Sequence, residues 1–183
     1  MSKKAPAVAS KNSPRVAIGW REWVGFPELG FAAIKAKVDT GARSSSLHAV
    51  DIETFRKRGV EWVRFEVHPE QRSVVGSRIC EAAVFDRRSV RSSNGKKELR
   101  VFIHTLAQLG SESWPIELTL TGRSDMGFRL LLGREAMRRR FIVDPGRSFL
   151  LGQRDAPPGS LDPRRGKHHH SARTKRAVKG KTT

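Results

Sequence analysis

The sequence predicts an all-β domain with little helix. Between about residues 15 and 153, short runs of alternating apolar and polar side chains are separated by segments rich in glycine, proline, asparagine and serine. Alternation with a period of two is typical of strands that bury one face, and such segments mark the turns between them. No window approaches the roughly 18 consecutive apolar residues of a membrane-spanning helix, so we expect no membrane partner.

Four candidate strands lie in the first half of this body. In the clearest, apolar residues at positions 34, 36 and 38 alternate with Lys35 and Lys37, and Asp39 lies just past the end of the run. Valine and phenylalanine alternate with charged residues in the same way between positions 63 and 67. The predicted strands are Ile18 to Val24, which breaks at Gly25-Phe26-Pro27, then Phe31 to Val38, Leu47 to Ile52 and Val60 to Val67.

The second half is predicted to contain a hairpin, further strands and one short helix. Arg78 to Val90 and Leu99 to Thr105 are joined by the polar segment RSSNGKKE, whose Asn94-Gly95 pair strongly favours a tight turn. One or two helical turns are expected at Gly133 to Arg140. The remaining predicted strands are Trp114 to Leu120, Phe128 to Leu132, Phe141 to Val143 and Ser148 to Leu151, the last two flanking an Asp144-Pro145-Gly146 turn.

The positive charge, formally +18, is prominent at both ends of the chain. Residues 1–14 carry three lysines and no acid, and residues 154–183 carry nine Lys or Arg against two acids. Both segments are poor in the large apolar side chains that would offset the entropy lost on ordering. We therefore expect a disordered basic arm at 1–14, a folded domain at 15–153 and a disordered basic tail at 154–183. Such segments would attract RNA, ribosomes or acidic proteins, or would only raise solubility.

The single cysteine and the start of the chain bear on its compartment. Cys80 has no partner within the chain for a disulfide, and a Cys-rich zinc site is excluded. The segment MSKKAPAVASKNS is basic but lacks the apolar region of a secretory signal. We therefore expect a cytoplasmic protein.

The segment KVDTGARSSSLHAV, from Lys37 to Val50, places one aspartate before a Thr-Gly pair. Peptide hydrolysis by carboxylates uses two of them, roughly 3 Å apart and sharing one proton; one activates water and the other protonates the scissile carbonyl. Asp39 could supply one carboxylate, while Gly41 would permit a close approach of the loops and unusual dihedrals. Thr40 could lock two such loops together. Asp39, Thr40 and Gly41 are therefore the candidate catalytic residues, although many strand-to-turn junctions read Asp-Thr-Gly.

A second motif, Leu130-Leu131-Leu132-Gly133-Arg134-Glu135, lies about 90 residues downstream. Together the two motifs resemble the retropepsin-type aspartic proteases. The segments VDTGARSSSLHA, RSSNGKKELR, ELTLTGRSDMGFRLLLGREAM and VDPGRSFL are similar to a bacterial branch long labelled ATP-dependent zinc proteases. The resemblance covers nearly all of 15–153. It implies a small closed β-barrel of the acid-protease type with one short C-terminal helix.

The resemblance also implies an aspartic-type peptidase that hydrolyses peptide or glutamate-tail amide bonds. Members of this branch are associated with ATP-grasp glutamate ligases, including a system that adds glutamates to a small-subunit ribosomal protein, whose tail they are thought to trim. The chain has one Asp-Thr-Gly and is too short for two such halves. We therefore expect a homodimer in which Asp39 of each subunit meets at the axis. Asp125, in SDMG, is more simply a loop residue.

The residues expected to contact the substrate are Ala42, Arg43, Ser44 and Arg134. Ala42 offers no hydroxyl to stabilise an ionised pair, which suits catalysis near neutrality. Many retroviral members have an acid where Arg43 stands, and that acid pairs with the arginine of the Gly-Arg motif. Arg43 is therefore expected either to grip a substrate carboxylate bidentately or to be a solvated surface arginine.

Two other functions stay open from the sequence. One is a non-catalytic binding module of the same fold that docks on ribosomes, RNA or acidic proteins through its basic tails. Tryptophans next to basic residues could add a nucleic-acid surface, although core or interface positions are simpler. These tryptophans are Trp20, Trp23, Trp62 and Trp114.

The other open function is a zinc-dependent peptidase. No His-Glu-x-x-His segment is present, and His48, His68 and His104 lack partners at helical spacing. A glycine-rich phosphate loop is also missing from the sequence. We therefore expect no metal and no cofactor.

Overall fold

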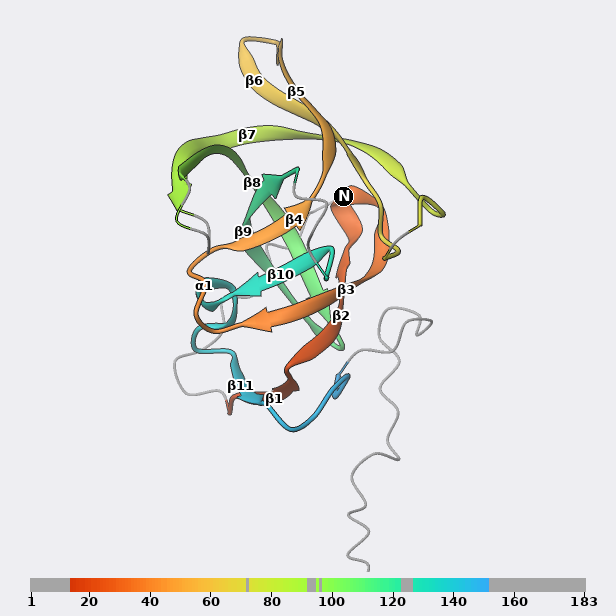
Figure 1. Ribbon diagram of the computed structural model, residues 1–183, viewed down its shortest axis with the longest axis vertical. Helices are drawn as coiled ribbons and strands as arrows, with labels where there is room; N and C mark the ends of the chain where they lie inside the picture. The colour runs from red at the N-terminus through yellow and green to blue at the C-terminus, as the bar shows by residue number, and fades with distance from the viewer. Residues whose placement is uncertain (1–13, 72, 92–94, 96, 123–126, 152–183) are drawn as a thin grey trace, which may run out of the picture.

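The computed structural model describes residues 14–71, 73–91, 95, 97–122 and 127–151 (Figure 1). Its regular structure is mostly β, with one four-residue α-helix and one 3-10 turn among the described residues, which confirms the all-β prediction. The predicted basic arm at 1–14, apart from Pro14, and the predicted tail at 154–183 lie outside the described residues. None of the helices in the described ranges has the length and apolar character needed to cross a membrane.

The described elements follow one another in the order β1, β2, η1, β3 to β10, α1, β11. Their bounds are β1 Val16–Gly19, β2 Arg21–Phe26, η1 Pro27–Leu29, β3 Phe31–Asp39, β4 Ser45–His48, β5 Val50–Lys57, β6 Val60–Val67, β7 Arg78–Arg91, β8 Lys97–Leu109, β9 Glu112–Thr121, β10 Leu130–Gly133, α1 Arg134–Met137 and β11 Phe141–Asp144.

One large sheet carries most of the fold. Its strand order is β2-β3-β10-β4-β9-β8-β7-β6-β5, and an additional pairing of β2 with β8 turns part of it into a ring. That closure consists of one residue pair, Gly25 with Gln108, so the predicted closed barrel is a ring-like sheet. Strands β5 and β6 project beyond the ring as a hairpin at the top of Figure 1. Strands β1 and β11 form a separate parallel pair.

The core lies on the inner face of this ring. The prediction that Ile34, Ala36 and Val38 face inward on β3 is confirmed, since each is at most 8% exposed. Trp114 of β9 is buried as well, and its indole Nε1 donates to the carbonyl of Ala136 in α1 at 2.9 Å. The largest fully buried side chains are Phe26, Phe65, Phe102, Ile18, Ile34, Leu47, Ile103, Leu109, Leu118, Leu130, Leu132 and Glu22.

Two predicted strands are each divided in the structure. The run Ile18 to Val24 is interrupted at Trp20, because β1 pairs with β11 whereas β2 pairs with β3. The break predicted at Gly25-Phe26-Pro27 is confirmed at Pro27, where η1 begins; β2 itself continues through Phe26 with a shift of register between Val24 and Phe26. The run Leu47 to Ile52 is likewise divided at Ala49, where the chain leaves β9 and β10 and turns to β6.

Several further boundaries differ from the predictions; β5 extends to Lys57 and β8 to Leu109, for example. Ser148 to Leu151 is not a strand: Phe149 has a left-handed φ of 53°, and the amides of Leu150 and Leu151 donate to the Glu22 carboxylate. The strand predicted from Phe128 begins at Leu130. The predicted hairpin of β7 and β8 is confirmed by the pairing of Arg91 with Lys97. Asn94 of its predicted turn, like Asp125, lies outside the described residues.

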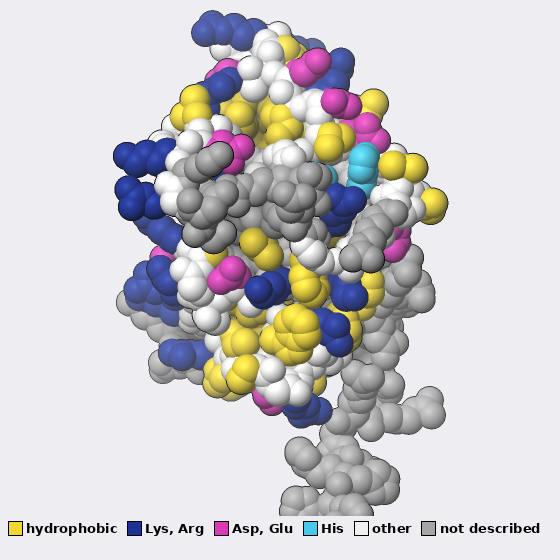
Figure 2. All heavy atoms as spheres, in the orientation of Figure 1, with side chains coloured by type: hydrophobic (Ala, Val, Ile, Leu, Met, Phe, Trp, Pro, Cys, Tyr) yellow, Lys and Arg dark blue, Asp and Glu magenta, His cyan; other side chains and the backbone are white. Residues whose placement is uncertain are grey.

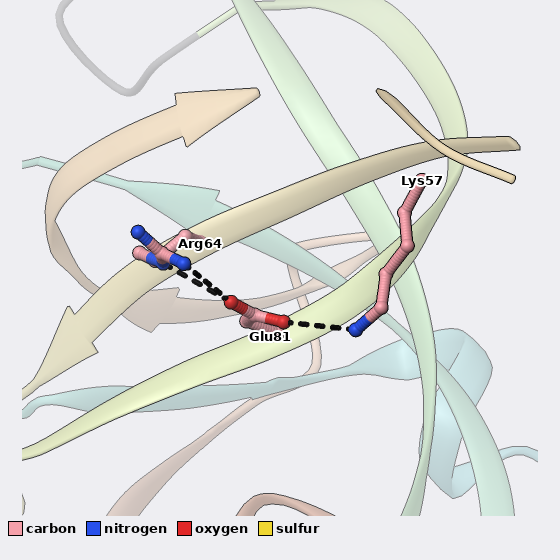
Figure 3. Close-up of polar contacts among 3 residues, drawn as sticks. All are labelled: Lys57, Arg64 and Glu81. Atoms are coloured by element: carbon pink, nitrogen blue, oxygen red, sulfur yellow. Dashed lines mark hydrogen bonds and ion pairs between the residues drawn. The ribbon is translucent and has the colours of Figure 1, made fainter. Parts of the chain in front are cut away.

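Ion pairs tie together the strands that extend beyond the ring. Glu81 of β7 accepts from Arg64 of β6 at 2.8 Å and from Lys57 of β5 at 3.4 Å (Figure 3). The hydrogen bonds from Arg64, with a smaller contribution from Lys57, hold the pKa of Glu81 below its ordinary value. These charges are largely solvated, so we expect their contribution to stability to be small.

Cys80 is a buried thiol whose chemistry can be tested. It is 6% exposed, and burial raises its pKa from 9.0 to about 11. We expect a thiol-specific disulfide reagent at pH 8 to modify the unfolded chain in urea at least roughly 100-fold faster than the native protein.

The raised pKa of Cys80 also makes the stability of the protein depend on pH. Because the thiol has a higher pKa in the folded protein than in the unfolded chain, its contribution to the free energy of unfolding is complete below pH 9 and is lost as the pH rises through 11. Urea titrations at pH 8 and 10.5 should therefore show that the free energy of unfolding falls more between these pH values for wild type than for Cys80→Ala. Equal losses in the two proteins would contradict this account.

Candidate active site

Asp39 is the last residue of β3, and its carboxylate organises the loop that follows. Its Oδ1 accepts from the backbone amides of Gly41 at 3.1 Å and Ala42 at 3.0 Å. A carboxylate that accepts two such amides fixes the turn after the strand. The side chain of Asp39 is half-buried, so its carboxylate remains accessible to solvent.

The second sequence motif lies directly beside this loop. Strands β3 and β10 run parallel, with Gly133 opposite Asp39 and Leu132 opposite Val38. The register of these strands therefore brings the two motifs together. Beyond β10, the amide of Arg134 donates to the carbonyl of Ala42 at 2.8 Å.

Gly133 allows the two motifs to pack against each other. A Cβ at this position would lie 2.4 Å from the carbonyl carbon of Ser44 and 2.8 Å from the amide nitrogen of Ser45. Both are backbone atoms that cannot move aside cheaply. The amide of Gly133 also donates to the hydroxyl of Ser45, which is 1% exposed, at 3.1 Å. The close contact therefore requires glycine, and Ser45 satisfies its buried amide.

Arg134 holds the Asp-Thr-Gly loop from the side. Its Nη1 donates to the carbonyl of Thr40 at 3.0 Å. This residue was predicted to contact substrate; the structure places its guanidinium on the loop backbone.

Arg43 follows the loop with an exposed side chain. Its carbonyl accepts from the amide of Glu135 at 3.1 Å, which fixes its backbone. The Glu135 carboxylate lies 3.8 Å from Arg138 and forms no ion pair with Arg43. Within the described ranges no carboxylate forms an ion pair with Arg43. The neighbouring Ser44 is half-buried beside Gly133.

The role predicted for Gly41 needs a correction. Its φ is not positive, so it supplies no left-handed conformation. A Cβ at this position would meet only the Oδ1 of Asp39, at 3.4 Å. Within one subunit the loop is therefore compatible with a small side chain, and the side chain of Thr40 beside it is exposed.

The histidines considered as zinc ligands lie apart from one another in the structure. His48 is buried in β4, His68 lies 3.1 Å from Glu66, and His104 stacks on Phe85 with ring centroids 3.8 Å apart. In the described part of the chain, no group of three or more His, Cys, Asp and Glu side chains could hold a metal ion.

The arrangement offers one accessible carboxylate on a braced loop. Such a group can act as a general base toward water or as a general acid toward a carbonyl, but not as both in the same step. Hydrolysis by the two-carboxylate route therefore needs a second acid. Sequence reasoning missed one residue that supports this site, Ser45, because no motif marks a serine whose role is to satisfy a neighbouring strand. Ser44 was expected to contact the substrate, but the contact of its backbone with Gly133 was not predicted.

Comparisons with known proteins identify the family and the fold of the chain. A family model described as RimB-like, retropepsin-like aspartic endopeptidase RimB, matches residues 17–154. The chain is similar to a crystal structure of Lpg0085, a protein with unknown function (DUF785) from Legionella pneumophila subsp. pneumophila str. Philadelphia 1. The TM-score is 0.63 with 28% identity, over 76% of this chain and 100% of that one.

Curated relatives carry a similar sequence within a longer protein. A probable alpha-L-glutamate ligase of Shewanella halifaxensis is 54% identical over 138 residues, which cover 75% of this chain and 30% of the relative. A protein with the same description from Desulfotalea psychrophila is 50% identical over 147 residues, 79% of this chain and 31% of the relative. The chain thus spans about a third of the length of these relatives. Since the family model covers most of the chain, the chain belongs to the RimB-like family of retropepsin-like aspartic endopeptidases.

Proposed function

We propose that the chain is an aspartic peptidase that hydrolyses amide bonds in acidic peptides, with glutamate tails as its substrate class. The observation that carries this proposal is the accessible Asp39 carboxylate at the end of β3, on a loop braced by Gly133 and Arg134. Rigid support of this kind is what a reacting carboxylate needs, because small errors in its position cost large factors in rate.

The second carboxylate comes from a second copy of the chain. In a C2 dimer the two Asp39 loops face each other across the axis, and one proton shared between the carboxylates allows one to act as base and the other as acid. The absence of a side chain on Gly41 would then serve the contact between loops, since nothing within one subunit requires it. In such a dimer the exposed Thr40 side chains would lie at the same contact.

Two observations support an acidic substrate. Arg43 lies four residues after Asp39 and is exposed, with no ion-pair partner among the described residues. The curated relatives that contain a similar segment are described as probable alpha-L-glutamate ligases. A peptidase that removes glutamates would reverse the reaction of an enzyme that adds them.

The proposal is tested by measuring peptidase activity and the fraction of dimer at the same protein concentrations. The purified chain is incubated with a protein bearing a C-terminal run of glutamates, and mass spectrometry follows the loss of residues. Analytical ultracentrifugation at the same concentrations gives the fraction of dimer. Specific activity should rise with that fraction, because only the dimer contains two carboxylates. A fully active monomer would contradict the dimer, and an intact substrate at saturating dimer would contradict the peptidase.

A further inference from the structure

A row of cations leads along β3 to Asp39. Side chains alternate between the two faces of a strand, so Lys35, Lys37 and Asp39 lie on one face, while the apolar residues between them are buried on the other. Successive members of the row are two residues apart, which separates their Cα atoms by about 7 Å.

Strand β2 widens this row. Arg21 is paired with Lys37 and Trp23 with Lys35 in the antiparallel register of β2 and β3. Residues opposite each other in such a register share a face of the sheet. Figure 2 shows Lys and Arg side chains gathered with hydrophobic ones over the region of β2 and β3. We refer to Arg21, Lys35 and Lys37 as the cationic row.

Aromatic rings hold two members of the row in place. The Arg21 guanidinium lies 4.6 Å from the ring centroid of Trp20 and 5.0 Å from that of Phe149. The ammonium of Lys35 lies 5.8 Å from the rings of Phe128 and Phe149. Cation–π contacts orient a charged group without neutralising it, so Arg21 and Lys35 are held in place and still positively charged.

The charges of the row are not balanced within the described part of the protein. No ion pair joins Arg21, Lys35 or Lys37 to a carboxylate among the described residues, whereas Lys57 and Arg64 share Glu81. Clustered cations without partners repel one another and raise the local concentration of anions.

We propose that the cationic row binds the carboxylates of an acidic peptide and leads it to Asp39. This inference rests on the proposed function and adds residues that determine its substrate. An extended peptide repeats its side chains on one face every 7 Å or so, the spacing of Lys35 and Lys37, so neighbouring lysines can pair with alternate glutamates. A peptide is favoured over a single-stranded nucleic acid because Arg21 and Lys35 already cover the rings on which bases would stack.

The test compares two matched lysine variants on two matched peptides. Lys37→Gln removes a charge from the row, and Lys57→Gln removes one from the far end of the sheet, at β5. Each protein is assayed with a glutamate-rich peptide and with its glutamine counterpart. Lys37→Gln should raise KM for the glutamate peptide about fivefold relative to the glutamine peptide, and Lys57→Gln should not change this ratio. Equal effects of the two variants would overturn the row and leave the peptidase standing.

Binding to a catalytically inactive protein separates the two proposals. Fluorescence anisotropy measures the affinity of Asp39→Asn protein, with and without Lys37→Gln, for a labelled glutamate peptide and for labelled oligothymidylate. Lys37-dependent binding of the glutamate peptide, combined with no hydrolysis by wild type, would support the row and refute the peptidase. Tighter binding of oligothymidylate with the same dependence on Lys37 would overturn the row as a peptide site.

Discussion

Replacing Asp39 with asparagine is expected to lower kcat by at least about 10³-fold without unfolding the protein. The amide oxygen of asparagine can still accept from the amides of Gly41 and Ala42, which now donate to Oδ1 at 3.1 and 3.0 Å. The loop should therefore keep its shape. The loss is chemical: an amide can neither take a proton from water nor deliver one to the scissile carbonyl, and such transfers contribute roughly 10²- to 10⁴-fold.

The chain contains a matched control for this substitution. Asp144 accepts from the amide of Gly146 at 2.9 Å, two residues on, as Asp39 does from Gly41. Asp144→Asn makes the same chemical change at a similar turn, and we expect it to retain activity. The rates are measured on the glutamate-tailed substrate, with thermal unfolding of both variants as the check on folding.

The same assays discriminate between a peptidase and a binding module, since a binding module would bind the glutamate peptide without hydrolysing it in wild type or in either variant. Under the proposed function, Asp39→Asn loses hydrolysis but still binds the glutamate peptide, because the proposed substrate contacts lie at other residues. If Asp39→Asn hydrolyses the substrate as fast as Asp144→Asn, the reaction does not depend on Asp39 and the dyad is wrong.

The parts of the fold that the sequence predicts are those in which local pattern and tertiary contacts agree. The alternation in β3 reflects one buried and one open face, and the Gly-Arg motif marks a contact so close that no side chain fits at Gly133. Each of these constraints determines which residue types stand at neighbouring positions of the sequence. The sequence therefore identifies both segments, and the structure adds their pairing, with Gly133 opposite Asp39.

The missed boundaries have a different physical origin. The predicted strands are interrupted at Trp20 and at Ala49 because the chain changes partner strands there. The sequence of an apolar run does not specify which strand pairs with it. The segment from Ser148 to Leu151 has the composition of a strand, yet the Glu22 carboxylate satisfies two of its amides. Long-range contacts of this kind override local propensity.

Glu22 is also the clearest case in which composition misleads. In REWVGF of β2, an acid beside a tryptophan suggests that the tryptophan faces the core. The structure has the opposite arrangement: Glu22 is fully buried, whereas Arg21 and Trp23 are half-buried on the outer face. The reason lies outside the strand, in backbone amides that require an acceptor.

Glu22→Ala is accordingly expected to cost about 3 to 5 kcal/mol in the free energy of unfolding. Its carboxylate accepts from the amides of Gly19 at 2.7 Å, Leu150 at 2.8 Å and Leu151 at 3.3 Å. Alanine would leave these donors without that acceptor in the interior, and each unsatisfied buried group costs roughly 1 to 3 kcal/mol. Since domains of this size are stable by only about 5 to 15 kcal/mol, this loss should clearly lower the urea concentration at the midpoint of unfolding.

Glu28→Ala is the matched control, because Glu28 also accepts from a distant backbone amide, that of Leu106 at 2.8 Å, but is exposed. Water can replace its carboxylate, so we expect a cost below about 1 kcal/mol. The cost of Glu22→Gln should fall between these two values. Its side-chain amide keeps one acceptor oxygen, but its NH2 group replaces the other oxygen and would face a backbone N–H donor. If Glu22→Ala proves no more destabilising than Glu28→Ala, the buried carboxylate is not what fixes residues 150 and 151 against β2.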